Sequence, residues 1–308
     1  MSRVLVVGSV AFDSVETPFG QVEEALGGSA LYFSNSASHF AGVDLVAVVG
    51  EDFPEEPIEK LEAQGVDTSG LYRAEGETFR WKGKYGYDLD DPDTLDTQLN
   101  VFGDFSPDLP EEYRDSEFVF LANIAPELQM EVLDQVDDPK FVALDTMNFW
   151  IDSKRDELVE ALERIDMLVI NEMEARQLAD DANIVQAAET IRDMGPQMLA
   201  IKRGEYGALV FTPEGKVFAP AYPLEEGYDP TGAGDTFAGG LIGYLAGRGE
   251  VNETRIRQAS VIGGVMASFC VEEFSLGGLD GLTDDMIARR FEKFERLVDF
   301  QTIDSLEE

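Results

Sequence analysis

The sequence predicts an α/β protein built on a doubly wound, mostly parallel sheet that is flanked by helices. Short, β-branched runs that are almost uninterrupted by polar residues recur along the chain, and stretches of helical period lie between them. Such continuous apolar runs are typical of parallel strands that are covered on both faces. The chain has 308 residues and is 44% hydrophobic, which is enough to bury one large core.

The continuous apolar runs and the stretches of helical period predict the individual strands and helices. We expect strands at Arg3–Val7, Leu45–Val49, Phe118–Leu121, Phe141–Leu144, Met167–Ile170 and Met198–Ile201, with a hairpin near Ala208–Phe218. We expect helices at Ser29–Phe40, Pro57–Gln64, Pro126–Val136, Ser153–Arg164, Ile184–Met194, Gln258–Cys270 and Leu282–Phe300. Ligands bind beyond the carboxyl ends of strands in such sheets, so the first polar residue after a run is a candidate for the rim of a cleft. These residues are Asp13, Asn123, Asp145, Asn171 and Lys202.

Charge and cysteine content restrict the partners and the compartment. The formal net charge is −39 and the pI is about 4.1, which makes nucleic acid and anionic membrane surfaces poor partners. A dispersed acidic surface suits a salt-rich (halophilic) cytoplasm, where ions screen self-repulsion; an acidic protein of an ordinary cytoplasm is the alternative. The single cysteine, Cys270, excludes an intramolecular disulfide. Because Met1 leads directly into an apolar strand and no apolar run is long enough for a membrane span, we expect a cytoplasmic protein.

The most informative stretch is glycine-rich and runs from Asp229 to Ala246. Gly232 and Gly234 allow a sharp turn, and the small apolar residues after them predict a helix whose N-terminal N–H groups attract an anion such as phosphate. Asp235 places a carboxylate at the same point, where it could accept a proton from an attacking hydroxyl. The alternative is a connection in which Asp235 or Thr231 only caps a buried helix.

Two other motifs lie at strand ends. Asn171-Glu172-Met173-Glu174 predicts a helix cap, with Asn171 as N-cap and Glu174 reaching back to it. Lys202-Arg203-Gly204 follows the next strand, and Gly207 further along is compatible with a glycine turn between two strands. With one histidine, His39, a Ser-His-Asp triad and a histidine-based zinc site are not expected.

Asp229-Pro-Thr-Gly-Ala-Gly-Asp235-Thr-Phe resembles, without a gap, the C-terminal signature of the PfkB/ribokinase family of carbohydrate and nucleoside kinases. It is not a Walker A loop, because no Gly-Lys-Ser/Thr follows the glycines. The resemblance extends from Val4 to about Leu282 and implies a ribokinase-like fold with a small β-sheet lid. We expect the lid at residues 13–25 and 73–104, and the α/β core at 1–12, 26–72 and 105–308.

The resemblance also implies roles for single residues. Asp235 would be the general base of phosphoryl transfer from ATP, with an anion hole made by Gly232, Ala233 and Gly234. Asn171 and Glu174 would support Mg²⁺, largely through water, and Asn171, Lys202 and Gly204 would contact the nucleotide. Asp13, Gly27 and Gly28 would hold the acceptor, and Asp229 and Thr231 would bind a monovalent cation such as K⁺. One departure is Tyr32, which stands where the family commonly has an asparagine.

The acceptor and the lid leave alternatives open. In Glu77–Tyr87, aromatic and basic residues alternate, which predicts a strand with one aromatic and one basic face. The resemblance implies that this strand belongs to the lid, which closes over the substrate or forms a homodimer contact. Asp88–Asp96 is acidic and turn-rich, and we expect a solvated loop there. A sugar or sugar-like polyol is the first expectation for the acceptor and a nucleoside the second. A non-catalytic sugar- or nucleotide-binding protein is the alternative of another class; a Rossmann dehydrogenase is not favoured, because Gly-x-Gly-x-x-Gly is absent after the first strand.

Overall fold

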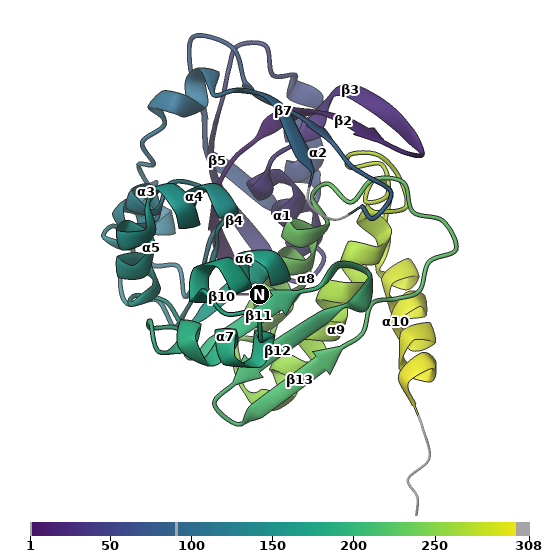
Figure 1. The fold of residues 1–308 in the computed structure, drawn as a ribbon. Coiled ribbons are helices and arrows are strands. Elements are labelled where there is room, and N and C mark those ends of the chain that lie inside the picture. The colour runs from purple at the N-terminus through teal and green to yellow at the C-terminus, as the bar shows by residue number, and fades with distance from the viewer. Residues whose placement is uncertain (1, 90–91, 300–308) are drawn as a thin grey trace, which may run out of the picture.

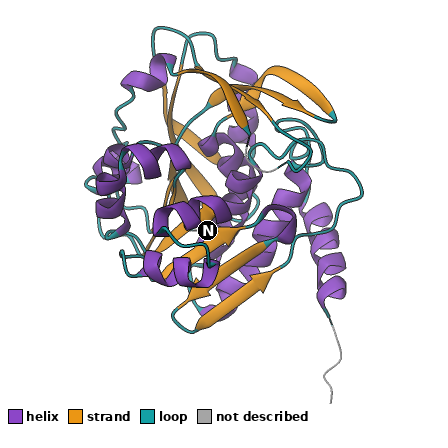
Figure 2. Ribbon diagram, viewed as in Figure 1, coloured by secondary structure: helices purple, strands orange, loops and turns teal. Residues whose placement is uncertain are grey.

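The computed structural model describes residues 2–89 and 92–299, which form two sheets and the helices around them (Figures 1 and 2). The large sheet has nine strands in the order β13-β12-β11-β10-β9-β8-β1-β4-β5. Their bounds are β1 Arg3–Val7, β4 Gly42–Val49, β5 Val66–Arg73, β8 Phe118–Leu121, β9 Phe141–Asp145, β10 Met167–Asn171, β11 Met198–Lys202, β12 Ala208–Thr212 and β13 Gly215–Ala219. The expected doubly wound sheet is confirmed.

The large sheet is parallel except for its β12 and β13 edge. Strand β1 lies between β4 and β8, so the chain winds outward from β1 to β5 on one side and from β8 to β13 on the other. Every expected strand of this sheet is present, but β5 was not expected. Its sequence, VDTSGLYR, is mostly polar because β5 is an edge strand that buries few of its residues.

Helices cover both faces of the large sheet (Figure 1). One face packs against α1, α8 and α9, and the other against α3, α5, α6 and α7. The helix bounds are α1 Ser29–Ala37, α2 Glu55–Ala63, α3 Pro126–Leu133, α4 Asn148–Ser153, α5 Arg155–Leu162, α6 Glu172–Ala179, α7 Ile184–Arg192, α8 Ala233–Arg248, α9 Glu253–Cys270 and α10 Asp284–Val298. The expected closing helix is therefore α10, and residue 300 lies outside the described residues. None of the helices described here has the length and apolar character that a bilayer crossing requires.

Helix α8 is enclosed by several neighbouring elements. It is apolar on all sides because it lies between the sheet, α1 and α9. Its glycines allow this close approach: a Cβ on Gly239 would lie 2.5 Å from the carbonyl oxygen of Phe33, and one on Gly243 would lie 2.8 Å from Cα of Ala37. Packing from several elements therefore fixes the position of the first turn of α8.

The second sheet has four strands in the order β3-β2-β6-β7. Their bounds are β2 Ala11–Thr17, β3 Gly20–Gly27, β6 Phe79–Lys84 and β7 Asp93–Gln98. This small sheet lies beside the large one, at the top of Figure 1. The expectation of a loop across Asp88–Asp96 is wrong at its end, because β7 begins at Asp93; its residues are all exposed, so no apolar alternation marks it. Residues 90 and 91 lie outside the described residues.

Candidate active site

The first turn of α8 carries backbone donors that face away from the helix. Gly232 is the N-cap residue, with a left-handed φ of 74° that glycine adopts without strain. Within the described chain, the N–H groups of Gly232 and Gly234 make no hydrogen bond. The N–H of Ala233, the third expected donor, is already directed at the carbonyl oxygen of Pro230, at 3.1 Å. The turn therefore offers two unengaged donors next to the positive end of the helix dipole.

Asp235 lies on the same turn and has an unusual acid–base character. Burial and the nearby charge of Asp145 together raise the pKa of its carboxyl group to about 7, against the opposing charge of Lys202. Asp235 is partly buried as a residue, like Gly232, Ala233 and Gly234 before it in the same turn. A carboxyl group with a pKa near neutrality is well suited to accept a proton at physiological pH.

Lys202 lies directly over the glycine turn. Its Nζ would be only 2.9 Å from a Cβ placed on Gly234, and its side chain is 17% exposed. Both carboxylate oxygens of Asp145 lie 3.4–3.5 Å from Nζ. Burial works against the charged form of Lys202, but the charges of Asp145, Glu174 and Asp235 raise its pKa overall. A lysine that is held cationic beside free N–H groups provides a second attraction for phosphate.

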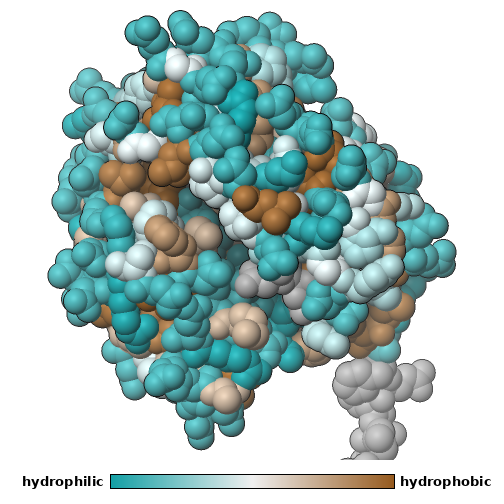
Figure 3. All heavy atoms as spheres, turned by 45° about the horizontal axis from the view of Figure 1, so that its top comes forward, coloured by the Kyte–Doolittle hydropathy of each residue, from teal (hydrophilic) through white to brown (hydrophobic). Residues whose placement is uncertain are grey.

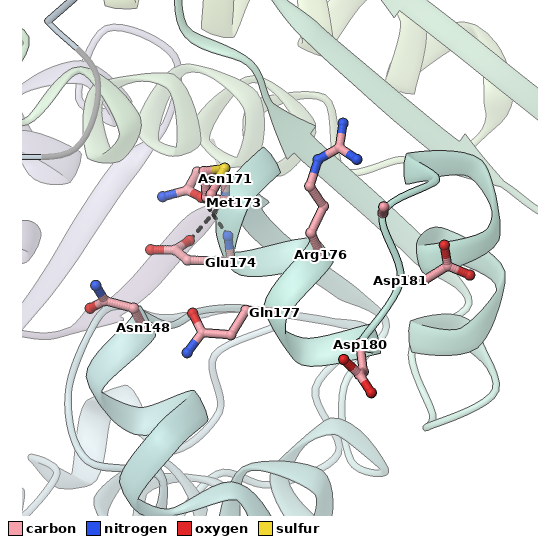
Figure 4. A pocket seen from close by; sticks show the side chains of 9 residues that line it. Asn148, Asn171, Met173, Glu174, Arg176, Gln177, Asp180 and Asp181 are labelled. Atoms are coloured by element: carbon pink, nitrogen blue, oxygen red, sulfur yellow. Dashed lines mark hydrogen bonds between the residues drawn. The ribbon is translucent and has the colours of Figure 1, made fainter.

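Asn171 and Glu174 form the expected capping box at the start of α6. The side chain of Asn171 accepts from the N–H of Glu174 at 2.8 Å, and Glu174 accepts from the N–H of Asn171 at 2.9 Å (Figure 4). Asn171 is the register partner of Lys202 in the parallel pair β10–β11, so the two motifs lie side by side at the carboxyl ends of their strands. The cap holds Glu174 close enough to Lys202 to influence its pKa.

An open depression of about 660 Å³ lies beside this cap, between α4 and α6. Its lining includes Asn148, Met173 and Gln177 as well as Asn171 and Glu174, and Figure 4 shows these side chains from close by. No residue of the glycine turn lines it. A second hollow is visible near the centre of the face in Figure 3, within a mainly hydrophilic surface. We therefore define the site by its donors, base and charges and not by the size of one depression.

Asp13 approaches the same turn from the small sheet. It is 6% exposed, and burial together with the charges of Asp229 and Asp235 raises its pKa to about 7, against a hydrogen bond from the backbone of Gly28. A Cβ on Gly27 would lie 1.9 Å from Oδ2 of Asp13, so the absence of a side chain at residue 27 leaves room for this carboxyl group. Asp13, Gly27 and Gly28 are therefore brought together with Asp235, as the sequence predicts.

Asp229 and Thr231 lie behind the turn and brace it. The carboxylate of Asp229 accepts from the N–H of Thr231 at 2.9 Å and from that of Ser275 at 3.1 Å. The hydroxyl group of Thr231 lies 3.2 Å from that of Tyr85, next to β6 in the small sheet. These contacts connect the turn to the rest of the molecule and involve both residues that were expected at a monovalent-cation site.

Several expected residues are placed differently from the cluster. Asn123 uses its side-chain oxygen to accept from Nε1 of Trp150 at 2.9 Å. Gly204, expected at the nucleotide, begins a short 3₁₀ turn that ends at Tyr206. The basic face of β6 is paired with carboxylates: Arg80 with Asp52 and Glu24, and Lys84 with Glu16. Asp145 was expected only at the rim; its direct contact with Lys202 depends on strand register, which the sequence pattern does not contain.

The residues present fit Mg²⁺ held mainly by phosphate and water. In residues 2–89 and 92–299, no group of three or more His, Cys, Asp or Glu side chains is arranged to hold a metal ion. Mg²⁺ in kinases keeps several waters and uses one or two carboxylates with substrate phosphates, and the carboxylates of Glu174 and Asp145 next to Lys202 satisfy that smaller requirement.

The fold and this turn place the protein among ribokinase-like α/β kinases. The chain belongs to the pfkB family of carbohydrate kinases, whose sequence pattern matches residues 1–276, and kinases of this family are phosphotransferases with an alcohol group as acceptor. It is similar to the cytidine kinase of Thermococcus kodakarensis, with 34% identity over 258 residues that cover 80% of this chain and 90% of that protein. It is also similar to the inositol 3-kinase of Arabidopsis thaliana, with 27% identity over 309 residues that cover 94% and 80% of the two chains.

Solved structures share the fold. The nucleoside kinase of Methanocaldococcus jannaschii, an archaeal member of the ribokinase family, has a TM-score of 0.75 at 21% identity and covers 95% of this chain and 99% of its own. A putative ribokinase II from E. coli in complex with ATP and Mg²⁺ has a TM-score of 0.76 at 20% identity, with coverages of 96% and 100%.

Proposed function

We propose that the protein transfers the γ-phosphoryl group of ATP to a hydroxyl group of a sugar or sugar-like acceptor. The observation that carries the proposal is the position of Asp235, a carboxyl group with a pKa of about 7 that follows the unengaged N–H groups of Gly232 and Gly234. Asp235 takes the proton of the acceptor hydroxyl, whose oxygen then forms the new bond to phosphorus while the bond to the ADP oxygen breaks. The N–H groups of Gly232 and Gly234 stabilise the charge on the transferred group, whereas that of Ala233, the third donor expected from the sequence, is directed at Pro230.

The other charged residues hold the two substrates. Lys202 contacts the phosphates, and Asn171 and Gly204 border the nucleotide. When bound, Mg²⁺ neutralises phosphate charge, supported by Glu174 and Asn171. Asp13, Gly27 and Gly28 hold the acceptor. We also propose a K⁺ site at Asp229 and Thr231, which a comparison of rates in K⁺ and K⁺-free buffers tests.

A nucleoside acceptor is the second candidate, and Trp81 favours it. Trp81 is the register partner of Asp13 in the parallel pair β2–β6, so both side chains lie on the same face of the small sheet. Its indole folds across Gly83, where a Cβ would lie 2.1 Å from the ring, and Nε1 donates to Thr94 at 3.3 Å. The flat, partly exposed ring of Trp81 lies on the same face as the carboxyl group of Asp13 and is suited to stack on a nucleobase. The similarity to a cytidine kinase supports the same candidate.

Release of ADP from ATP and Mg²⁺ at high KCl, across sugars, sugar phosphates and nucleosides, tests the proposal. We expect one acceptor class to stimulate turnover. ATP binding without stimulation by any compound would instead favour the non-catalytic binding protein.

Replacing Trp81 by leucine should separate the two acceptor classes. Base stacking contributes about 1–3 kcal/mol, so KM for a nucleoside should rise by roughly 10-fold or more, while kcat changes little. Trp81→Phe, which keeps a flat ring, is the matched control and should retain most of the affinity. An unchanged nucleoside KM in Trp81→Leu, measured by steady-state kinetics, would assign the base to another surface.

Activity should fall as the pH is lowered through about 7, because the pKa of Asp235 is raised to that value and only the deprotonated form accepts a proton. Below it, log(kcat/KM) should lose about one unit per pH unit, with a plateau above. Asp145→Asn should move this acidic limb to lower pH, since the charge of Asp145 contributes to the raised pKa. A limb that stays in place in Asp145→Asn would contradict the assignment to Asp235.

We further propose that the protein works in a salt-rich cytoplasm and forms a homodimer through the small sheet, as a lid. The exposed Leu95 of β7 and Tyr87, exposed by 53% and 89%, support an apolar contact there. Sedimentation of the intact chain and of Leu95→Asp tests the dimer.

A further inference from the structure

Tyr32 lies against the glycine turn from the side of α1. A Cβ placed on Gly232 would lie 2.4 Å from each of three ring carbons of Tyr32: Cγ, Cδ2 and Cε2. Equal contact with three carbons means that the face of the ring, and not its edge, covers Cα of Gly232. The side chain is only 1% exposed, so the ring is part of the protein interior and not of the acceptor surface.

The side chain of Tyr32 is also packed into the protein core. Tyr32 belongs to a buried cluster that includes Val265, Met266, Phe269 and Cys270 of α9. The ring is thus fixed between α9 and Gly232, and a rigid flat surface limits the movement of the glycine backbone.

The hydroxyl group of Tyr32 does not account for the effect of this residue on the glycine turn. It makes no hydrogen bond to any described part of the chain. Burial, together with the nearby thiol of Cys270 and the carboxylates of Asp13, Asp229 and Asp235, raises the pKa of the phenol well above its usual value. The group therefore stays protonated and supplies neither charge nor base, which leaves the flat ring as the part that acts on the turn.

We propose that Tyr32 is a positioning residue for phosphoryl transfer, whose ring holds Gly232 in its left-handed conformation so that the N–H groups of Gly232 and Gly234 keep a common direction. This inference rests on the proposed function of the turn as an anion hole. It also accounts for Tyr32 in place of an asparagine, because a shorter side chain would leave the space beneath Gly232 unfilled. Asn35 does not take the place of that asparagine, since its side chain donates to the carbonyl oxygen of Leu31 in its own helix, at 2.9 Å.

Two substitutions separate the ring from the hydroxyl group. Tyr32→Leu removes the flat surface and should lower kcat by about 10- to 100-fold, as expected when catalytic donors are displaced by a fraction of an ångström, while KM for ATP and for the acceptor stays within about threefold. Tyr32→Phe keeps the ring and should retain kcat within about twofold. Equal losses in the two variants would show that the hydroxyl group acts, and would overturn the proposal.

Phe294→Leu is the matched control. Phe294 is 2% exposed in the same buried cluster but belongs to α10, and the atoms nearest to a Cβ on Gly232 are those of Tyr32. Phe294→Leu should lower the unfolding temperature as Tyr32→Leu does, but it should leave kcat unchanged. If Phe294→Leu also lowered kcat, the effect of Tyr32→Leu would be one of general packing. Should Tyr32→Leu not fold, Tyr32→Met, which fills the volume with a flexible chain, gives the same comparison. If the unmodified protein is active and Tyr32→Leu has an unchanged kcat, the role of Tyr32 is refuted but the proposed kinase function is not. If the unmodified protein shows no kinase activity, the proposed function is refuted as well.

Discussion

Replacing Asp235 by asparagine should lower kcat by about a thousandfold or more, within the range for loss of a positioned general base. The substitution keeps the shape of the side chain but removes its ability to accept a proton from the acceptor hydroxyl. ATP binding should be retained, because the phosphate contacts assigned to Lys202 and the glycine turn are unchanged. The substitution also removes the negative charge of Asp235 beside Lys202, and with it a repulsion between that carboxylate and the phosphates of ATP. Steady-state ADP release and ATP titration measure the two quantities separately.

The control for Asp235→Asn is Asp229→Asn in the same loop. Asp229 is 1% exposed and accepts from two N–H groups behind the turn, so its loss should reduce stability and kcat together. Asp235→Asn should instead reduce kcat at an unchanged unfolding temperature. Residual activity within tenfold of the parent protein would show that another group, or water, takes the proton.

Replacing Gly232 by alanine should lower kcat by about 100-fold, in line with the loss of oriented oxyanion donors. Two costs act at this residue. Its φ of 74° disfavours a Cβ by about 1–2 kcal/mol, and the added Cβ would lie 2.4 Å from the ring of Tyr32. The turn must therefore shift, and the N–H groups of Gly232 and Gly234 shift with it. The measurement is kcat together with the free energy of unfolding.

Gly249→Ala supplies a matched control at the other end of the same helix. Gly249 is the C-cap of α8, with a φ of 66°. The nearest atom to an added Cβ there is Oγ of Ser2, at 3.7 Å, which is ordinary contact. This variant should lose about 1–2 kcal/mol of stability but keep its kcat. Equal kinetic losses in the two variants would mean that the helix as a whole, and not the direction of the N–H groups, limits the rate.

The strands of the parallel sheet could be predicted because burial on both faces leaves a continuous apolar run in the sequence. Edge strands leave no such run: β5 buries only Val66 and Gly70, β7 is exposed throughout, and neither was expected as a strand. Helix ends were less accurate: the helix expected at Ser153–Arg164 is α5, which runs from Arg155 to Leu162, and the short α4 before it was not expected. The capping box at Asn171 and Glu174 was correct, because both partners lie within one turn of sequence.

In the candidate site, too, some contacts could be predicted from the sequence and others could not. Contacts within one motif, such as the order Gly232, Gly234 and Asp235, follow from sequence and helix geometry. Contacts between motifs depend on strand register and side-chain packing. The approach of Lys202 to Asp145, 57 residues away, depends on the order of β9, β10 and β11. The stacking of Tyr32 on Gly232 depends on the close packing of α1 and α8, which no local pattern encodes.

The close packing of α8 has a consequence for how this family diversifies. On the proposed assignment, the transfer machinery belongs to a helix that is packed between the sheet and two other helices, where most substitutions would be costly. Asp13 and Trp81, which the same proposal assigns to the acceptor, belong instead to the small sheet. Mutations can therefore accumulate around the acceptor without disturbing phosphoryl transfer. Such a separation accounts for relatives as different in acceptor as a cytidine kinase and an inositol 3-kinase within one common architecture.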